Sequence, residues 1–170
     1  TGGVAIFQVA NAVIAIHLPL RLALEGYGAV AVGLVTASYA VGFMSGCLLG
    51  PRVIRSVGHI RAFAVFAAIC SVAALAFGFG VLPVLWILLR LALGFATAGL
   101  FTVTESWLND RTPTRYRGSV LSFYMIATKL TYAFGQALPG FTDTASLAAF
   151  MLAGAFYTLS LIPVAMTSAT

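Results

Sequence analysis

Long apolar segments constrain this chain more than any other feature of its sequence. Each runs for about 20 residues without alternation of polar and apolar side chains. An α-helix needs about 20 apolar residues to cross the ~30 Å hydrocarbon core of a bilayer, whereas a membrane β-barrel shows ~10-residue segments of alternating polarity. The sequence therefore predicts one all-α transmembrane domain, a six-helix bundle over residues 1–170. The predicted spans are residues 4–24, 30–49, 60–79, 82–104, 116–138 and 145–166.

The composition excludes a soluble globular domain. Hydrophobic residues make up 61% of the chain and charged residues 8%, against about 45–50% and ~25% in soluble domains. The net charge of +5 does not indicate nucleic-acid binding, because long apolar runs separate the cations. We therefore expect an integral membrane protein with no nucleic-acid partner.

Basic residues predict the orientation of the chain. Cytoplasmic loops of membrane proteins carry an excess of Lys and Arg. Two of the predicted loops are rich in arginine, and the other connections are poorer. Both rich loops, and with them both termini, are expected to face the cytoplasm. The arginines concerned are Arg52, Arg55 and Arg61 after the second span, and Arg111, Arg115 and Arg117 after the fourth.

Small residues and a faint repeat indicate how the spans pack. Gly42 and Gly46 form a GxxxG on the second span, and Gly94 and Ala98 a small-xxx-small pair on the fourth; such spacings let helix backbones approach in lipid. "GLVTASY" at residues 33–39 and "GSVLSFY" at residues 118–124 share the pattern G-x-V-x-x-x-Y. Each opens the middle helix of a three-span unit, which favours two units of opposite direction, as in inverted-repeat transporters.

Two stretches carry a resemblance to a known family. "GCLLGPRVIRSVGHIR" is similar to the glycine-and-arginine loop, motif A, of the major facilitator superfamily; Gly46, Arg52 or Arg55, Gly58 and Arg61 match its pattern, while the usual aspartate is absent. In "RLALGFATAG", the residues Arg90, Gly94 and Ala98 resemble the R-x-x-x-G-x-x-x-A core of motif B. With "ESWLNDRT", the chain resembles the N-terminal half of the YcaD-like subgroup of this superfamily.

The resemblance implies a fold and a function. It implies half of a major facilitator fold, a 3+3 inverted repeat that faces a second six-helix half across a central cavity, in the bacterial inner membrane. It also implies a secondary active transporter of a small solute, working by alternating access. The residues predicted to form the cytoplasmic gate are Arg52, Arg55, Gly58, Arg61, Glu105 and Arg117, with Glu105 taking part of the role of the absent aspartate. Glu105 would meet an arginine such as Arg52, Arg55 or Arg117 in an ionic latch; alternatively, this stretch is a solvated loop with Trp107 anchored at the interface.

Two cations fall deep inside predicted spans. Ionisable groups inside a membrane are expensive and usually face a cavity or a partner. Arg90 and Lys129 each lie about eight or nine residues from a span end, whereas all four carboxylates (Glu25, Glu105, Asp110 and Asp143) lie near predicted helix ends or in loops. Both cations are therefore expected to attract an anionic substrate or a carboxylate on the second half. Alternatively, Arg90 bonds backbone carbonyls and Lys129 is neutral or faces water.

Polar neighbours extend this candidate cavity site. Ser122, Met125, Lys129, Tyr132 and Gln136 recur at helical spacings of three and four, which predicts one more-polar stripe on the fifth span. Family analogy places the first and fourth helices at the cavity, which adds a polar residue of the first span. The candidate cavity residues are Asn11, Arg90, Lys129, Tyr132 and Gln136.

Polar residues near the end of the first span receive simpler interpretations. Arg21 and Glu25 are expected to form a surface pair at helical i,i+4 spacing. His17 is expected to lie in the wet membrane interface.

No enzyme chemistry is expected. The sequence has no Walker loop, HExxH or GxSxG. Cys47 and Cys70 have no CxxC spacing and no partner cluster, so neither a disulfide framework nor a metal site is expected. No cofactor is expected. Transport is the leading hypothesis; if protons drive it, the titrating carboxylate would lie on the second half. The alternative is a structural subunit that packs against other membrane subunits and transports nothing. The expected partners are a small-molecule substrate, the lipid bilayer, and a second six-helix half in the same or a separate chain.

Overall fold

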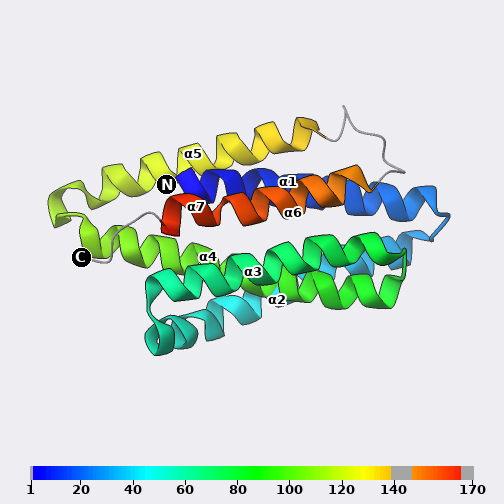
Figure 1. The fold of residues 1–170 in the computed structure, drawn as a ribbon, viewed down its shortest axis with the longest axis horizontal. Helices are drawn as coiled ribbons and strands as arrows, with labels where there is room; N and C mark the ends of the chain where they lie inside the picture. Colours follow the sequence, from blue (N-terminus) through cyan, green and yellow to red (C-terminus); the bar gives the residue numbers. More distant parts are fainter. Residues whose placement is uncertain (1, 139–146, 166–170) are drawn as a thin grey trace.

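The chain forms a bundle of long helices lying side by side (Figure 1). The computed structural model describes residues 2–138 and 147–165, and every regular element in those ranges is helical. The elements are α1 (Gly2–Leu24), α2 (Ala29–Val57), α3 (His59–Ala76), η1 (Phe77–Phe79), α4 (Pro83–Arg111), η2 (Thr114–Tyr116), α5 (Arg117–Ala137), α6 (Ala148–Leu159) and α7 (Leu161–Ala165).

Helix ends follow local backbone chemistry. α1 stops just before Gly26, whose φ of 81° is readily adopted only by glycine. α4 starts with Pro83 at its first position, where the missing N–H would have no partner anyway. It ends at Thr112, which takes an extended conformation (φ −106°, ψ 127°) because Pro113 disfavours helix in the residue before it.

Two helices run further than predicted. α2 continues through Pro51 to Val57 instead of ending near residue 49, and α4 continues to Arg111 instead of ending near residue 104. The predictions ended each span where the apolar run ended. Helices end where the backbone is forced out of helical geometry, here at Gly58 (φ 82°) and Thr112. At 29 residues each, α2 and α4 are about 43 Å long at 1.5 Å per residue, well beyond the ~30 Å hydrocarbon core.

The remaining helices agree with the predicted spans to different extents. α3 with η1 covers residues 59–79, and α5 covers 117–137, each within about a residue of the prediction. In place of the sixth predicted span, the structure has two helices, α6 and α7, which are separated at Ser160. Its predicted ends, residues 145–146 and 166, lie outside the described residues.

Four helices of the described part are long and apolar enough to cross a membrane: α1, α2, α3 with η1, and α4. α5 has the length, at 21 residues, but carries the polar stripe expected from the sequence, which lowers its hydropathy. The apolar helix Ala148–Pro163 is shorter than the other four. Length and composition alone therefore support four crossings, and the count of six remains a prediction.

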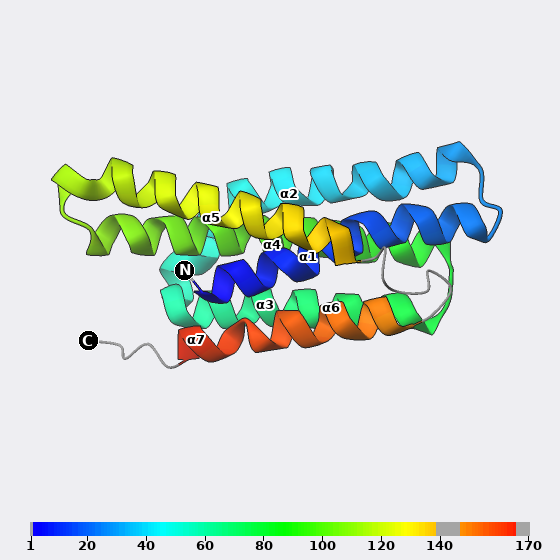
Figure 2. The ribbon, with the colours of Figure 1, turned by 90° about the horizontal axis from the view of Figure 1, so that it is seen from above.

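The helices pack in a pattern with internal symmetry. α2 packs chiefly on α4, and α5 packs chiefly on α1; α3 also contacts α4, α6 contacts α1, and α3 and α6 contact each other. Figure 2 shows α2 and α5 on one side of the bundle and α3 and α6 on the other. If α1, α2 and α3 are exchanged for α4, α5 and α6, respectively, the same pairs of neighbouring helices result.

The two ends of the bundle differ in charge. The α2–α3 and α4–α5 connections lie at one end, together with the start of α1 (Figure 1). Six of the nine basic residues of the chain are close to these connections. At the opposite end, the Tyr27 hydroxyl donates a hydrogen bond to the Val81 carbonyl (3.0 Å), which ties the α1–α2 turn to the α3–α4 turn. Arg21 there pairs with Glu25 at 2.8 Å, as predicted.

Glycines bring α2 and α4 into backbone contact. A Cβ at Gly42 would meet the backbone of Leu91, and one at Gly46 would meet the backbone of Phe95 and the Ala98 side chain. A Cβ at Gly94 would meet the backbone of Tyr39 and Phe43 in return. The predicted close packing at the small residues is confirmed, and the structure identifies the partner helix.

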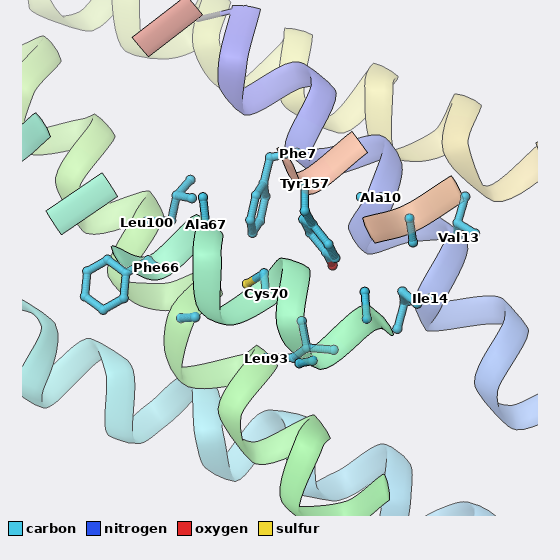
Figure 3. Packing of buried hydrophobic residues seen from close by; sticks show 14 of the residues in the cluster. Phe7, Ala10, Val13, Ile14, Phe66, Ala67, Cys70, Leu93, Leu100 and Tyr157 are labelled. Carbon is cyan, nitrogen blue, oxygen red and sulfur yellow. The ribbon is translucent and has the colours of Figure 1, made fainter. Parts of the chain in front are cut away.

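A hydrophobic core fills the space among α1, α3, α4 and α6. Phe7 of α1 lies against Tyr157 of α6 with ring centroids 4.9 Å apart (Figure 3). Cys70, Leu93 and Leu100 are fully buried around them. In contrast, α5 buries only Tyr124, Thr128 and Gly135 within the described structure. The core therefore belongs to the four helices, and α2 and α5 flank it.

Substituting Gly42 with Ala is expected to destabilise the protein by about 1–3 kcal/mol, because the added methyl group collides with a backbone that cannot move aside. The matched control is Gly33→Ala on the same helix, where an added Cβ meets nothing within 4 Å. Thermal unfolding of the purified variants in detergent measures the difference. Equal midpoints for the two variants would contradict the backbone contact between α2 and α4.

Candidate functional site

Arg90 lies at the centre of the candidate site. It is the eighth residue of α4, counting from Pro83, and only 4% exposed. Its guanidinium carbon lies 4.7 Å from the ring centroid of Tyr39 on α2, a cation–π arrangement. Its Nε and Nη1 have no hydrogen-bond partner among the described residues. A buried guanidinium with free donors can still accept an anion or another acceptor.

Asn11 joins this cluster from α1. Its side-chain amide donates to the Tyr39 hydroxyl at 3.3 Å, and Asn11 itself is 6% exposed. Tyr39 thus contacts α1 with its hydroxyl and α4 with its ring face. Both contacts depend on the glycine packing that holds α2 against α4.

The polar stripe of α5 approaches the cluster at one residue. Tyr132 is half-buried and lies near enough to interact electrostatically with Arg90. Lys129 and Gln136 are exposed on the same stripe. Lys129 takes part in no ion pair within residues 2–138 and 147–165. Asn11 and Arg90 thus meet at Tyr39, Tyr132 lies within electrostatic range of Arg90, and Lys129 and Gln136 lie at the bundle surface.

The predicted gate residues lie at the basic end of the bundle. Arg52 and Arg55 stand on the last turns of α2, and Arg61 on the first turn of α3, so the expected loop is reduced to Gly58. All three arginines are exposed. Gly58 forms the whole connection because its φ of 82° lets the chain reverse there.

Glu105 lies within a helix instead of at a loop. It is six residues before the end of α4 (105 to 111) and half-buried. In the described part of the chain it forms no ion pair with Arg52, Arg55 or Arg117. Arg117 instead donates its Nε–H to the Thr112 carbonyl at 3.1 Å, which satisfies an acceptor beyond the α4 terminus. The ionic latch is not formed within this half and stays a prediction.

A second polar cluster was not predicted from the sequence. His59 Nε2 lies 3.1 Å from the Ser106 Oγ and 3.9 Å from Asp110 Oδ2, which links the start of α3 to the end of α4. His59 is 47 positions from Ser106 in the sequence and further still from Asp110, so spacing gave no signal. Their placement at one end of the bundle was the available clue.

His17 differs from its expected environment. It was expected in the wet interface, but it is fully buried, and its ring meets the Phe150 ring edge-on at 4.9 Å. Neither ring nitrogen has a hydrogen-bond partner among the described residues. The expectation was wrong because α6 packs over this face of α1, which the sequence of α1 alone does not indicate.

The chain is similar to known membrane proteins. It matches the Major Facilitator Superfamily model over residues 1–168. It is 33% identical over 140 residues to proteins named "Uncharacterized MFS-type transporter YcaD" from Escherichia coli O45:K1, O81 and O139:H28. The alignment covers 80% of this chain and 36% of each relative. The chain thus spans little more than a third of the length of these curated relatives.

The Tyr39–Arg90 contact predicts a difference between two substitutions. Tyr39→Phe keeps a ring beneath the guanidinium, whereas Tyr39→Leu removes it and is expected to cost a further ~0.5–2 kcal/mol. Unfolding free energies in detergent measure this, and the same pair in an Arg90→Met background controls for ring packing. If the difference between Phe and Leu is unchanged in that background, the ring acts by packing alone and the cation–π assignment is wrong.

Proposed function

We propose a transport function from one premise: this chain belongs to the Major Facilitator Superfamily. The protein is not an enzyme but a membrane transporter, and the residues described here form one half of it. That half works with a second one to move a small solute by alternating access, in which two bundles rock around a site near the membrane midplane.

Six crossings with both termini in the cytoplasm are the proposed arrangement. Six arginines gather at the end with the α2–α3 and α4–α5 connections, and the opposite end holds Arg21 paired with Glu25. This asymmetry supports placing the arginine-rich end in the cytoplasm. α5, at 21 residues, is about 31 Å long and can cross the hydrocarbon core if its polar stripe faces a cavity.

The packing pattern supports a 3+3 inverted repeat. The contacts of α1, α2 and α3 correspond to those of α4, α5 and α6 in the same order. Gly135 of α5 approaches Val9 and Ala12 of α1, as the glycines of α2 approach α4. A repeat explains why the α2–α4 pair and the α1–α5 pair both pack closely at glycines.

The second half is proposed to cover the face that α2 and α5 flank. Only 22% of the most apolar window of α2 is buried in the structure, against 61% for α1. The relatives are long enough to contain a further bundle, since this chain covers 36% of their length. Asn11 and Arg90 of α1 and α4, with Lys129, Tyr132 and Gln136 of α5, would then line the cavity between the halves.

The proposal of an anionic substrate rests on Arg90. A buried guanidinium with two unpartnered donors is costly unless an acceptor joins it. No carboxylate pairs with it among the described residues. The acceptor is proposed to be the substrate anion or a carboxylate of the second half. Proton coupling, if present, would then use a carboxylate of that half.

The cytoplasmic gate is proposed to close across the two halves. Glu105 and the arginines Arg52, Arg55, Arg61 and Arg117 lie at one end and remain exposed or half-buried. Because Glu105 pairs with no arginine in the described ranges, its latch partner would be reached as the bundles rock.

A structural role without transport is the second candidate. The burial of Arg90 against Tyr39 favours it, because an arginine that only stabilises helix packing needs no bound solute. The two candidates differ in uptake. The full-length protein reconstituted in liposomes should accumulate a charged metabolite if it transports. A screen of anionic metabolites, with and without a pH gradient, that finds no uptake would support the structural role.

Lys129→Ala is expected to weaken binding of the transported anion by about 10–100-fold, because it removes a charged partner. Arg115→Ala, a surface arginine outside the candidate site, is the control. Arg90→Lys tests whether charge without the guanidinium fork suffices. Ligand-induced changes in the unfolding midpoint measure binding. Unchanged binding and uptake in both site variants would refute the anion site.

Lys129 also offers a test of which face of α5 meets water. It is the one lysine of this sequence, so peptide mass spectrometry can assign modification of this half's side chains by a water-soluble amine reagent to that residue. Modification in intact vesicles is expected, with protection by the transported anion. A lysine that faces acyl chains would resist the reagent, and that result would contradict the proposed cavity face.

A further inference from the structure

We propose that the arginine-rich end of this half binds the headgroup of an anionic phospholipid between α3 and α4. This proposal does not depend on the transported solute. It rests on a hollow between the start of α3 and the end of α4, on the charges around it, and on the apolar surface that leads away from it.

The hollow has the residues expected of a headgroup site. Its volume is about 460 Å³, and its lining includes Arg61, Trp107, Asp110 and Arg111 beside His59. The Arg111 guanidinium carbon lies 5.5 Å from the Trp107 ring centroid. Two arginines against Asp110 leave the lining with one net positive charge. That charge matches a single phosphodiester, the charge of a phosphatidylglycerol headgroup.

Helix lengths place this hollow at the headgroup level. α3 with η1 has 21 residues and is about 31 Å long, close to the thickness of the hydrocarbon core. His59 at its start therefore lies near one boundary of the core. α4 extends beyond the start of α3 at this end (Figures 1 and 2). Its last turn, with the half-buried Trp107, reaches the zone where tryptophan rings anchor.

An apolar stripe leads from the hollow along α3. Arg61 is followed on one helix face by Val65, Ala68, Val72 and Leu75, at spacings of four and three, and all of them are exposed. An acyl chain can lie along this stripe while its phosphate meets Arg61. A soluble phosphate compound would gain nothing from the stripe, and therefore a lipid fits these residues better than a free anion. Basic pockets between membrane helices on the cytoplasmic side bind lipid headgroups in this way.

The test uses the full-length protein, delipidated in detergent, with phosphatidylglycerol as the probe and phosphatidylcholine and glycerol phosphate as comparison ligands. Native mass spectrometry counts the bound molecules and gives their affinities. Phosphatidylglycerol should bind more tightly than either comparison ligand. Arg61→Gln should weaken its binding about fivefold, and Arg111→Gln similarly.

Arg115→Gln is the matched control. It removes the same charge at the same end of the bundle but does not line the hollow, so binding should be unchanged. Equal binding of phosphatidylcholine, equal binding of glycerol phosphate, or unchanged binding after Arg61→Gln would each overturn the proposal. An equal loss in Arg115→Gln would also overturn it, because the attraction would then be a general surface effect. Arg61 is exposed, so size-exclusion chromatography should find its variant folded.

Discussion

The backbone contact between α2 and α4 is the constraint on which the candidate site depends. Without hydrophobic exclusion to drive helices together in lipid, close van der Waals packing at small residues has to hold them. Gly42 and Gly94 let the two backbones approach, and this brings the Tyr39 ring over Arg90. From the same position the Tyr39 hydroxyl reaches Asn11 on α1. A larger residue at either glycine would push the helices apart and move the Tyr39 ring away from Arg90.

The fold treats its two deep cations differently. Arg90 is enclosed by this half and stabilised by the Tyr39 ring, and its Nε and Nη1 have no partner in the part of the chain that the structure describes. Lys129 is exposed on α5 and is stabilised by no ion pair in the described structure. The cost of a charge in hydrocarbon falls when the charge reaches water or a partner. Arg90 is thus held in place by this half, whereas Lys129, on a helix that is proposed to cross the membrane, would need an aqueous cavity or a second bundle.

Much of the fold could be predicted from the sequence, because the length of an apolar run decides where a helix lies in a membrane. The ends of α2 and α4 could not be predicted in this way. Helix termination depends on backbone signals such as Gly58, and an internal Pro51 did not end α2. Chemistry alone singled out Arg90 as a cation inside a helix. Side-chain contacts were not predictable where rotation of one helix against another decides them, as for His17 under Phe150 and for His59 beside Asp110.

The contrast between the two ends of the bundle bears on how a half could move as one body. At the end opposite the arginines, Phe77, Trp86 and Phe150 form a cluster of rings with centroids 5.5–6.0 Å apart, and the Trp86 indole donates to the Gly80 carbonyl at 2.9 Å. Packed interiors of this kind transmit strain and do not deform continuously. At the arginine end, exposed charges and a single-residue connection at Gly58 replace such rings. In the proposed alternating access, a half built in this way could tilt without repacking its core, because the contacts that would change lie among exposed charges and on the outer faces of α2 and α5.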